Sequence, residues 1–281
     1  MSGWSSVLIF LSLLILLGLY LVSQNKWIQV KHFHIRLPNS GEGIKGKKIV
    51  QLSDLHLPKQ GVSMVQLIKI VELQKPDLIV LTGDLVDVRG PFPEKKLQNF
   101  AQSLVSIAPT YAVTGNHDAK GNYLQEWEDI LTTAGVRVLI DEAEWIEFEK
   151  DGFVLMGLSE KEDFDRAPRP ILRGISLTEG MQQQPKILLA HHPELFEDYL
   201  MDLNRAPDLI FSGHAHGGQI RLPFIGGLFS PGQGNLPKYT DGVYYEPEMP
   251  GNRMIVSRGI GNSTFPFRFN NRPEVVVVTL D

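Results

Sequence analysis

The sequence predicts an α/β domain built from two facing mixed β-sheets flanked by helices, preceded by one N-terminal transmembrane helix. Three observations carry this prediction. The segment from Ser2 to Asn25 is mostly apolar and contains no charged side chain. The first half of the remaining chain alternates short apolar runs, typical of buried strands, with segments whose apolar residues recur at helical spacing. The second half is mostly strand-like with few helices, which favours two packed sheets over one open sheet.

The N-terminal apolar run, Val7–Val22, is interpreted as a membrane anchor. At about 1.5 Å per residue, the interval from Trp4 to Trp27 covers roughly 35 Å, enough to cross a hydrocarbon core of about 30 Å with an aromatic residue at each interface. The alternative is a cleavable signal peptide. It is less favoured because no Lys or Arg precedes the run and no A-x-A-like site follows it.

We therefore expect a single-pass protein of the cell membrane, in which the anchor contributes nothing to the chemistry. Three basic residues, Lys26, Lys31 and Arg36, follow the span and by the positive-inside rule place the domain in the cytosol. The family resemblance described below favours the opposite side, so the side of the membrane stays open. The expected divisions are the anchor, a leader strand with a linker, and the globular domain: residues 1–25, 26–47 and 48–281.

Composition limits the function classes. A chain of 281 residues with 43% hydrophobic residues can form one domain of catalytic size behind its anchor. Its net charge of −5 gives no general attraction to phosphate backbones, so we expect no nucleic acid partner. The absence of cysteine excludes disulfides, thiolate nucleophiles and sulfur-ligated zinc. Any metal would be held by oxygen and imidazole nitrogen.

The strongest functional signal is a set of polar residues that follow strand-like runs. Carboxyl ends of parallel strands converge at one edge of a sheet, where sites form. In extended segments, residues two apart point the same way, which pairs Asp54 with His56 and His214 with His216. Seven possible ligands are too many for one tetrahedral ion and suit two ions that share a carboxylate, with Mn, Zn or Fe all compatible. These candidate ligands are Asp54, His56, Asp84, Asn116, His191, His214 and His216.

Five ordered motifs carry a family resemblance. The segments "SDLH", "GD", "GNHD", "HHP" and "GHAHGGQ" resemble the motifs of calcineurin-like metallophosphoesterases, and the likeness extends over Lys48 to Asp281. The anchor and "GGQIRLP" are most similar to the membrane-associated bacterial branch that includes UDP-2,3-diacylglucosamine pyrophosphatases of lipid A synthesis. The resemblance implies the sandwich fold of that family and a dinuclear metal centre.

The resemblance also implies a role for each residue. Asp54, His56 and His216 would hold one divalent ion. Asn116, His191 and His214 would hold the other, with Asp84 bridging the two. His117 would donate a proton near the leaving group while a hydroxide held between the metals attacks phosphorus.

Four further segments have two interpretations each. Asp118 either orients the His117 ring or is an exposed loop carboxylate. Arg221 and Arg258 either bind substrate phosphate or form ordinary surface salt bridges. The loop Leu222–Gly232 could touch acyl chains, but we expect a buried hairpin because exposed apolar patches are uncommon.

The favoured function is that of a membrane-anchored, dinuclear metal-dependent phosphohydrolase of a phosphodiester or pyrophosphate bond. Its substrate would be a phosphorylated small molecule or lipid, such as the lipid-linked nucleotide sugar UDP-2,3-diacylglucosamine. One alternative is a nuclease or phosphoprotein phosphatase of the same family; the acidic charge argues against the nuclease and nothing in the sequence tests the phosphatase. The other is a non-catalytic binding scaffold, which the complete ligand set argues against.

Overall fold

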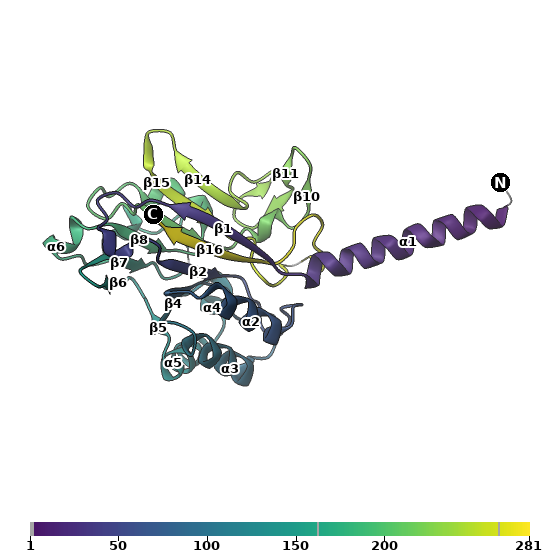
Figure 1. Ribbon diagram of the computed structural model, residues 1–281, viewed down its shortest axis with the longest axis horizontal. Coiled ribbons are helices and arrows are strands. Elements are labelled where there is room, and N and C mark those ends of the chain that lie inside the picture. The colour runs from purple at the N-terminus through teal and green to yellow at the C-terminus, as the bar shows by residue number, and fades with distance from the viewer. Residues whose placement is uncertain (1–2, 162, 264) are drawn as a thin grey trace.

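Two six-stranded mixed sheets pack face to face in the computed structural model, which describes residues 3–161, 163–263 and 265–281 (Figure 1). The predicted two-sheet α/β fold is therefore confirmed. The first sheet has the strand order β1-β16-β2-β3-β4-β5. Strands β2 to β5 run parallel to one another, whereas β1 and β16 run together in the opposite direction. Their bounds are β1 Gln29–Ile35, β2 Lys48–Leu52, β3 Leu78–Thr82, β4 Thr110–Val113, β5 Arg137–Val138 and β16 Glu274–Leu280.

The second sheet has the order β14-β15-β9-β8-β7-β6. Its four central strands are parallel, and the edge strands β14 and β6 are antiparallel to their neighbours. Its bounds are β6 Glu142–Phe148, β7 Asp151–Gly157, β8 Lys186–Leu189, β9 Leu209–Ser212, β14 Gly242–Glu246 and β15 Met249–Val256. Two small hairpins lie between β9 and β14: β10 Arg221–Leu222 with β11 Gly226–Gly227, and β12 Phe229–Ser230 with β13 Gly234–Asn235.

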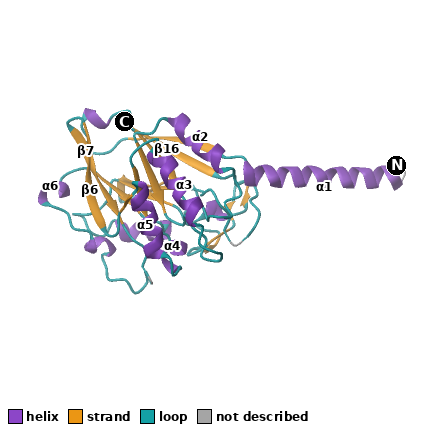
Figure 2. Cartoon of the chain, turned by 90° about the horizontal axis from the view of Figure 1, so that it is seen from below, coloured by secondary structure: helices purple, strands orange, loops and turns teal. Residues whose placement is uncertain are grey.

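Helices cover the two outer faces unequally (Figure 2). The first sheet packs against α2, α3 and α5, which bury amphipathic faces that include Leu67, Phe100 and Trp127. The second sheet is covered by shorter elements, among them α6, α7 and a 3₁₀ turn at Ile171–Gly174. The helix bounds are α2 Met64–Gln74, α3 Glu94–Val105, α4 Asn116–Lys120, α5 Leu124–Ala134, α6 Glu179–Gln182 and α7 Phe196–Tyr199.

An apolar layer between the two sheets fixes their relative position. It contains side chains from the central strands of both sheets, such as Val80 of β3 and Phe211 of β9. Strands β3, β8 and β9 are buried along their whole length, which explains why they read as continuous apolar runs in the sequence. Because these strands cannot slide without exposing their side chains, the loops at their carboxyl ends have defined positions.

Helix α1, Gly3–Lys26, projects from the domain as a long exposed rod (Figure 1). Within Ser6–Lys26, the apolar window has a mean hydropathy of 2.6 and none of that window is buried, so the helix is long and apolar enough to span a membrane. The next residues enter β1, which pairs along its length with β16 at the edge of the first sheet. The leader strand is thus an edge strand of this sheet.

The last two turns of α1 contact the domain. Gln24 is buried, and its Oε1 accepts a hydrogen bond of 3.1 Å from the backbone N–H of Asn271. The Tyr20 ring meets the edge of Phe269 with 5.4 Å between centroids. These contacts fasten the end of α1 to the segment that precedes β16.

Candidate metal centre

All the predicted ligands follow central strands and meet at the rim shared by the two sheets. In the first sheet, Asp54 and His56 follow β2, Asp84 follows β3, and Asn116 and His117 open α4 after β4. In the second sheet, His191 follows β8, and His214 and His216 follow β9. Each sheet therefore supplies only part of the cluster.

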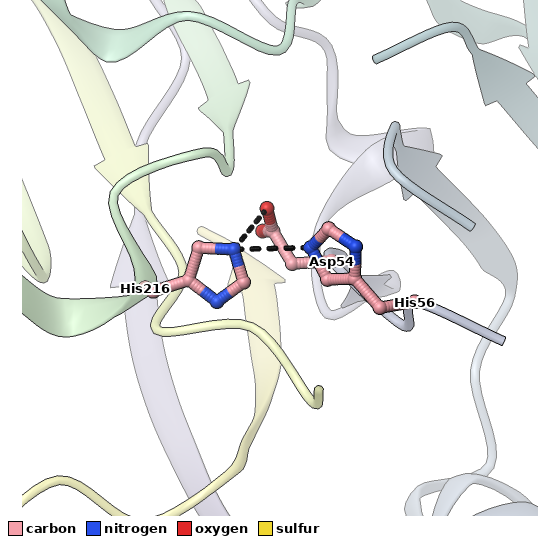
Figure 3. Close-up of side chains that lie close together, drawn as sticks. All are labelled: Asp54, His56 and His216. Carbon is pink, nitrogen blue, oxygen red and sulfur yellow. Dashed lines mark hydrogen bonds and ion pairs between the residues drawn. The ribbon is translucent and has the colours of Figure 1, made fainter. Parts of the chain in front are cut away.

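One group of possible ligand atoms consists of Asp54, His56 and His216 (Figure 3). The Nε2 atom of His216 lies 3.4 Å from Asp54 Oδ1 and 3.1 Å from His56 Nε2. All three side chains are almost completely buried. Two imidazoles and a carboxylate that converge in this way form half of a suitable site for Mn, Zn or Fe.

A second group consists of Asp84, His191 and His214. The Nε2 atom of His191 lies 3.4 Å from Asp84 Oδ2 and 3.2 Å from His214 Nδ1. The same Asp84 oxygen lies 3.6 Å from Nε2 of His56, a member of the first group. Asp84 therefore stands between the two groups, where a shared carboxylate would be needed.

Asn116 supplies a further oxygen that fits a metal site. Its Oδ1 atom is buried and, among the described residues, has no hydrogen-bond partner. Buried polar atoms are nearly always paired, so an unpaired amide oxygen beside a cluster of carboxylates and imidazoles is well explained by a bound cation. The donor set as a whole fits divalent metal ions.

The backbone at this rim is left-handed and not extended. The expectation that Asp54 pairs with His56, and His214 with His216, by alternation along an extended segment is therefore wrong. Five of the predicted ligands have positive φ values, a conformation that costs a non-glycine residue about 1–3 kcal/mol. The side chains converge because of these turns and not because residues two apart alternate along a strand. The φ values are 52° for Asp54, 51° for His56, 55° for Asp84, 64° for His214 and 47° for His216.

Backbone amides and glycines hold the two carboxylates in place. The N–H of His214 donates to both Asp54 oxygens, at 3.0 and 3.1 Å, and the N–H of His117 donates to Asp84 Oδ1 at 2.7 Å. A Cβ atom on Gly213 would lie 2.5 Å from Asp54 Oδ2, and one on Gly115 would lie 2.3 Å from Asp84 Oδ1. Glycine is required at both positions because any side chain would displace a carboxylate.

Burial keeps several imidazoles neutral. It lowers the pKa of His56 to about 4 and holds the pKa values of His214 and His216 well below their usual range. Neutral imidazoles offer the lone pairs that metal ions bind. Burial also opposes charge on Asp84 and His191, but their mutual attraction lowers the pKa of Asp84 and raises that of His191.

His117 lies beside the cluster with a different carboxylate from the one expected. Its Nδ1 atom is 3.4 Å from Asp87 Oδ1, and its ring centroid is 4.6 Å from that of His56. Burial opposes ionisation of Asp87, yet its hydrogen bonds from Arg89 lower its pKa to about 2. Asp118 is buried and instead accepts hydrogen bonds from the backbone N–H groups of Gly115, Leu85 and Val86, at 3.0, 3.3 and 3.1 Å. Asp118 braces the loops, and Asp87 is the residue that sequence reasoning missed.

Two glutamates near the centre were also missed. His192 is held between them, with its Nε2 atom 2.9 Å from Glu160 and its Nδ1 atom 2.9 Å from Glu194. Glu194 Oε1 lies 3.7 Å from Nε2 of His214 as well. Glu194 is close to the "HHP" motif in sequence and could have been included, whereas Glu160 comes from the distant β7–β8 connection.

The two arginines predicted to bind phosphate form salt bridges with carboxylates. Arg221 and Arg258 both pair with Asp241, at 2.7 and 2.5 Å, and Lys31 of β1 joins the same carboxylate at 2.5 Å. Glu274 of β16 lies 3.2 Å from Lys31. This charge network, Lys31, Arg221, Asp241, Arg258 and Glu274, ties the leader strand to the second half of the domain. The salt-bridge interpretation of both arginines is the one that the geometry supports.

Three hollows adjoin or approach the centre. A polar one of about 300 Å³ is lined by His56, Lys59, Asp87, Arg89, Asn262, Ser263 and Pro266. A mostly apolar one of about 580 Å³ is lined by His216, Gly218, Gln219, Ile220, Leu228, Phe229, Pro231, Ser263 and Phe265. A third, of about 380 Å³, is lined only by apolar residues: Leu17, Leu21, Ile220, Leu222, Phe265, Phe267 and Phe269.

Comparison with known proteins agrees with this geometry. The family model described as calcineurin-like phosphoesterase matches residues 47–218, which include every predicted ligand. The chain belongs to the calcineurin-like phosphoesterase family. A metallophosphoesterase of Aquifex aeolicus is 31% identical over 95% of this chain and 97% of its own length. The phosphodiesterase YaeI of Escherichia coli is 31% identical over 83% of this chain and 82% of its own.

A third relative of this phosphoesterase carries a membrane term in its name. A "transmembrane protein with metallophosphoesterase domain" of Danio rerio is 29% identical over 85% of this chain and 54% of its own length. The family membership makes the chain a metallophosphoesterase and leaves its substrate open.

Asp241→Asn should destabilise the phosphoesterase domain by about 3 kcal/mol, the low end for a broken buried ion pair, because these side chains keep some exposure. Burial opposes ionisation of Asp241, but Arg258, Lys31 and Arg221 lower its pKa from 3.8 to about 2. A lowered carboxyl pKa stabilises the fold above the unfolded value, so this stabilisation is lost as pH falls from about 4 towards 2. Denaturant unfolding across that range measures it.

The exposed Asp129 of α5 provides a matched control. Asp129→Asn should change the unfolding free energy by less than about 0.5 kcal/mol. If Asp241→Asn unfolds at the same denaturant concentration as Asp129→Asn at neutral pH, the network does not contribute as described.

Proposed function

We propose that the chain is a membrane-anchored phosphohydrolase that uses two divalent metal ions, Mn, Zn or Fe, to cleave a phosphodiester or phosphoanhydride bond. The observation that carries this proposal is the position of the Asp84 carboxylate, within 3.6 Å of an imidazole of each ligand group. Asp54, His56 and His216 would hold one ion, and Asn116, His191 and His214 the other. Bound metals would neutralise phosphoryl charge and supply an activated water.

The residues of the chain prepare the site for that chemistry. Burial of Asp54 and Asp84 removes competing water, and backbone N–H groups fix the carboxylates before any ligand binds. His117 is one-fifth exposed, so it can reach both the cluster and the solvent side where a leaving group would depart. In the proposal it gives a proton to that leaving group, and the carboxylate of Asp87 stabilises its protonated ring.

Two observations support a substrate at the membrane. Helix α1 has the length and apolar character of a membrane span, and a relative is named as a transmembrane protein. The name of the Escherichia coli relative supports phosphodiester chemistry. A lipid-linked nucleotide sugar such as UDP-2,3-diacylglucosamine is one candidate substrate, which a screen of nucleotide sugars with and without acyl chains would test against phosphomonoesters and aryl phosphodiesters.

Asp84→Asn should lower both metal content and hydrolysis, because an amide carries no charge with which to bridge two cations. The rate loss should exceed the 10–100-fold that is typical when an outer partner of a metal ligand is removed. Elemental analysis of the purified protein, combined with turnover of an aryl phosphodiester, measures both effects. Asp87→Asn should keep its metal. Two bound ions and near-normal turnover in Asp84→Asn would exclude the bridging role.

His117→Ala should keep the metals yet lose rate in a manner that depends on the leaving group. For substrates with poor leaving groups the loss should be about 10²–10⁴-fold, the usual contribution of general acid catalysis. For activated aryl esters it should be much smaller, since their leaving groups need little protonation. Parallel kinetics on the two substrate classes decide the point. An equal loss on both classes, or lost metal, would make His117 structural or a ligand.

The anchor should keep the full-length chain in the membrane pellet after alkaline extraction, because about 20 apolar residues bury their side chains in the hydrocarbon core. A chain that begins at Lys26 should be recovered in the soluble fraction. The intact mass of the mature protein distinguishes an anchor from a signal peptide, which would be missing. Protease protection of the domain in sealed vesicles would then report its side. Release of the full-length chain by alkali would rule out membrane spanning.

A further inference from the structure

An apolar path leads from the membrane helix to the metal centre. The hollow beside His216 and the hollow beside α1 share two lining residues, Ile220 and Phe265, so they adjoin. We call the two together the apolar groove. Its inner end reaches the Asp54, His56 and His216 group, and its outer end is walled by Leu17 and Leu21 of α1.

The outer wall is held in position by the contacts at the end of α1. Gln24 is bonded to Asn271, and the side-chain N–H₂ of Asn271 in turn donates to the backbone carbonyl of His216 at 2.7 Å. Tyr20 packs against Phe269, which itself lines the outer hollow. The groove is therefore part of the folded domain and lies where α1 leaves it.

The surroundings of the groove are apolar on the membrane side and polar beyond the centre. Phe265 and Phe267 are about half exposed, at 48% and 49%. On the other side, the polar hollow contains Lys59 and shares Ser263 with the groove. An elongated molecule could thus have its apolar part towards α1 and its charged part towards Lys59, with the metal centre between them.

We propose that the apolar groove holds an acyl chain of an amphiphilic phosphoester substrate whose phosphate group lies at the metal centre. This inference rests on the proposed function. A peptide or sugar in the outer hollow would leave its polar groups without partners, because every lining residue there is apolar; a chain of methylenes needs none. If α1 spans the bilayer, the outer end opens near the lipid surface, from which such a chain would enter.

The exposure of the loop Leu222–Gly232 fits this arrangement and corrects the expectation for this loop. It was expected as a buried hairpin, but Phe224, Ile225 and Phe229 are exposed, at 108%, 59% and 53%. Phe229 lines the groove, whereas Phe224 lines neither of its hollows. Phe224 therefore offers a control for Phe265 and Phe267, since it is an exposed phenylalanine that does not line the groove.

The test compares hydrolysis of short homologues of one phosphodiester that differ only in acyl length, kept below their critical micelle concentration, by the full-length protein in detergent. A chain that moves from water into the groove should raise kcat/KM by up to about fourfold per methylene. In Phe265→Ser and Phe267→Ser, the ratio of kcat/KM between the longer and shorter homologues should fall by about five- to tenfold. In Phe224→Ser the ratio should stay as in the wild type.

The outcomes separate this inference from the proposed function. Hydrolysis with no dependence on chain length, or an equal fall in Phe224→Ser and Phe265→Ser, would overturn the groove while the phosphohydrolase stood. The equal fall would mean that these exposed aromatic side chains merely insert into detergent or lipid. Absence of metal-dependent hydrolysis of any homologue would overturn the proposed function.

A measurement without turnover tests the groove in that last case. A long-chain alkylphosphonate with a photoreactive group at the end of its chain is bound to the full-length protein and cross-linked. Labelling of the segments at Ile220–Leu228 or Phe265–Phe269, suppressed in Phe265→Ser, supports the groove. Labelling spread along the exposed faces of α1, unchanged in that variant, overturns it.

Discussion

The structure depends on the Asp84 carboxylate, a buried acid at the rim between the two sheets. Its two oxygens contact His56 and His191 and accept the backbone N–H of His117, so loops from both sheets meet at one side chain. A buried carboxylate is costly unless it is paired, and here the partners are groups that a metal could also bind. Asp84 therefore needs partners for the stability of the fold, and its position between the two ligand groups would also allow two ions to share it.

The backbone at this rim adopts conformations that cost free energy. Five predicted ligands have left-handed conformations, and Gly115 and Gly213 come so close to the carboxylates that no side chain would fit. Such conformations persist only where the surroundings determine them. The buried layer between the sheets provides that constraint, because it fixes the ends of β2, β3, β8 and β9 from which the loops begin. Stability of the sandwich and precision of the site thus have one source.

The two ends of the chain connect helix α1 to the site. Helix α1 touches the segment before β16, and Asn271 in that segment holds the backbone of His216. The leader strand β1 lies beside β16, and its Lys31 joins the network around Asp241. A helix that looks like a simple tether is therefore coupled by hydrogen bonds to a candidate ligand loop. The position of α1 therefore bears on the geometry of the ligand loop as well as on where the protein is located.

The sequence by itself determined the two-sheet α/β class, the apolar helix and the group of candidate ligands, because these follow from local patterns: apolar runs, helical spacing, and polar residues directly after strands. It could not place Asp87 beside His117 or pair Arg221 and Arg258 with Asp241. Those contacts join residues far apart in the chain. Which charged side chains pair depends on the distances between them and on their burial in the folded structure. It also missed the left-handed turns: Asp and His adopt positive φ more often than most residues, but this conformation is still uncommon for them, so the surrounding contacts decide where it occurs. Only the tertiary structure decided which carboxylate faces which cation, and that a helix expected to stand apart would form one wall of a groove leading to the centre.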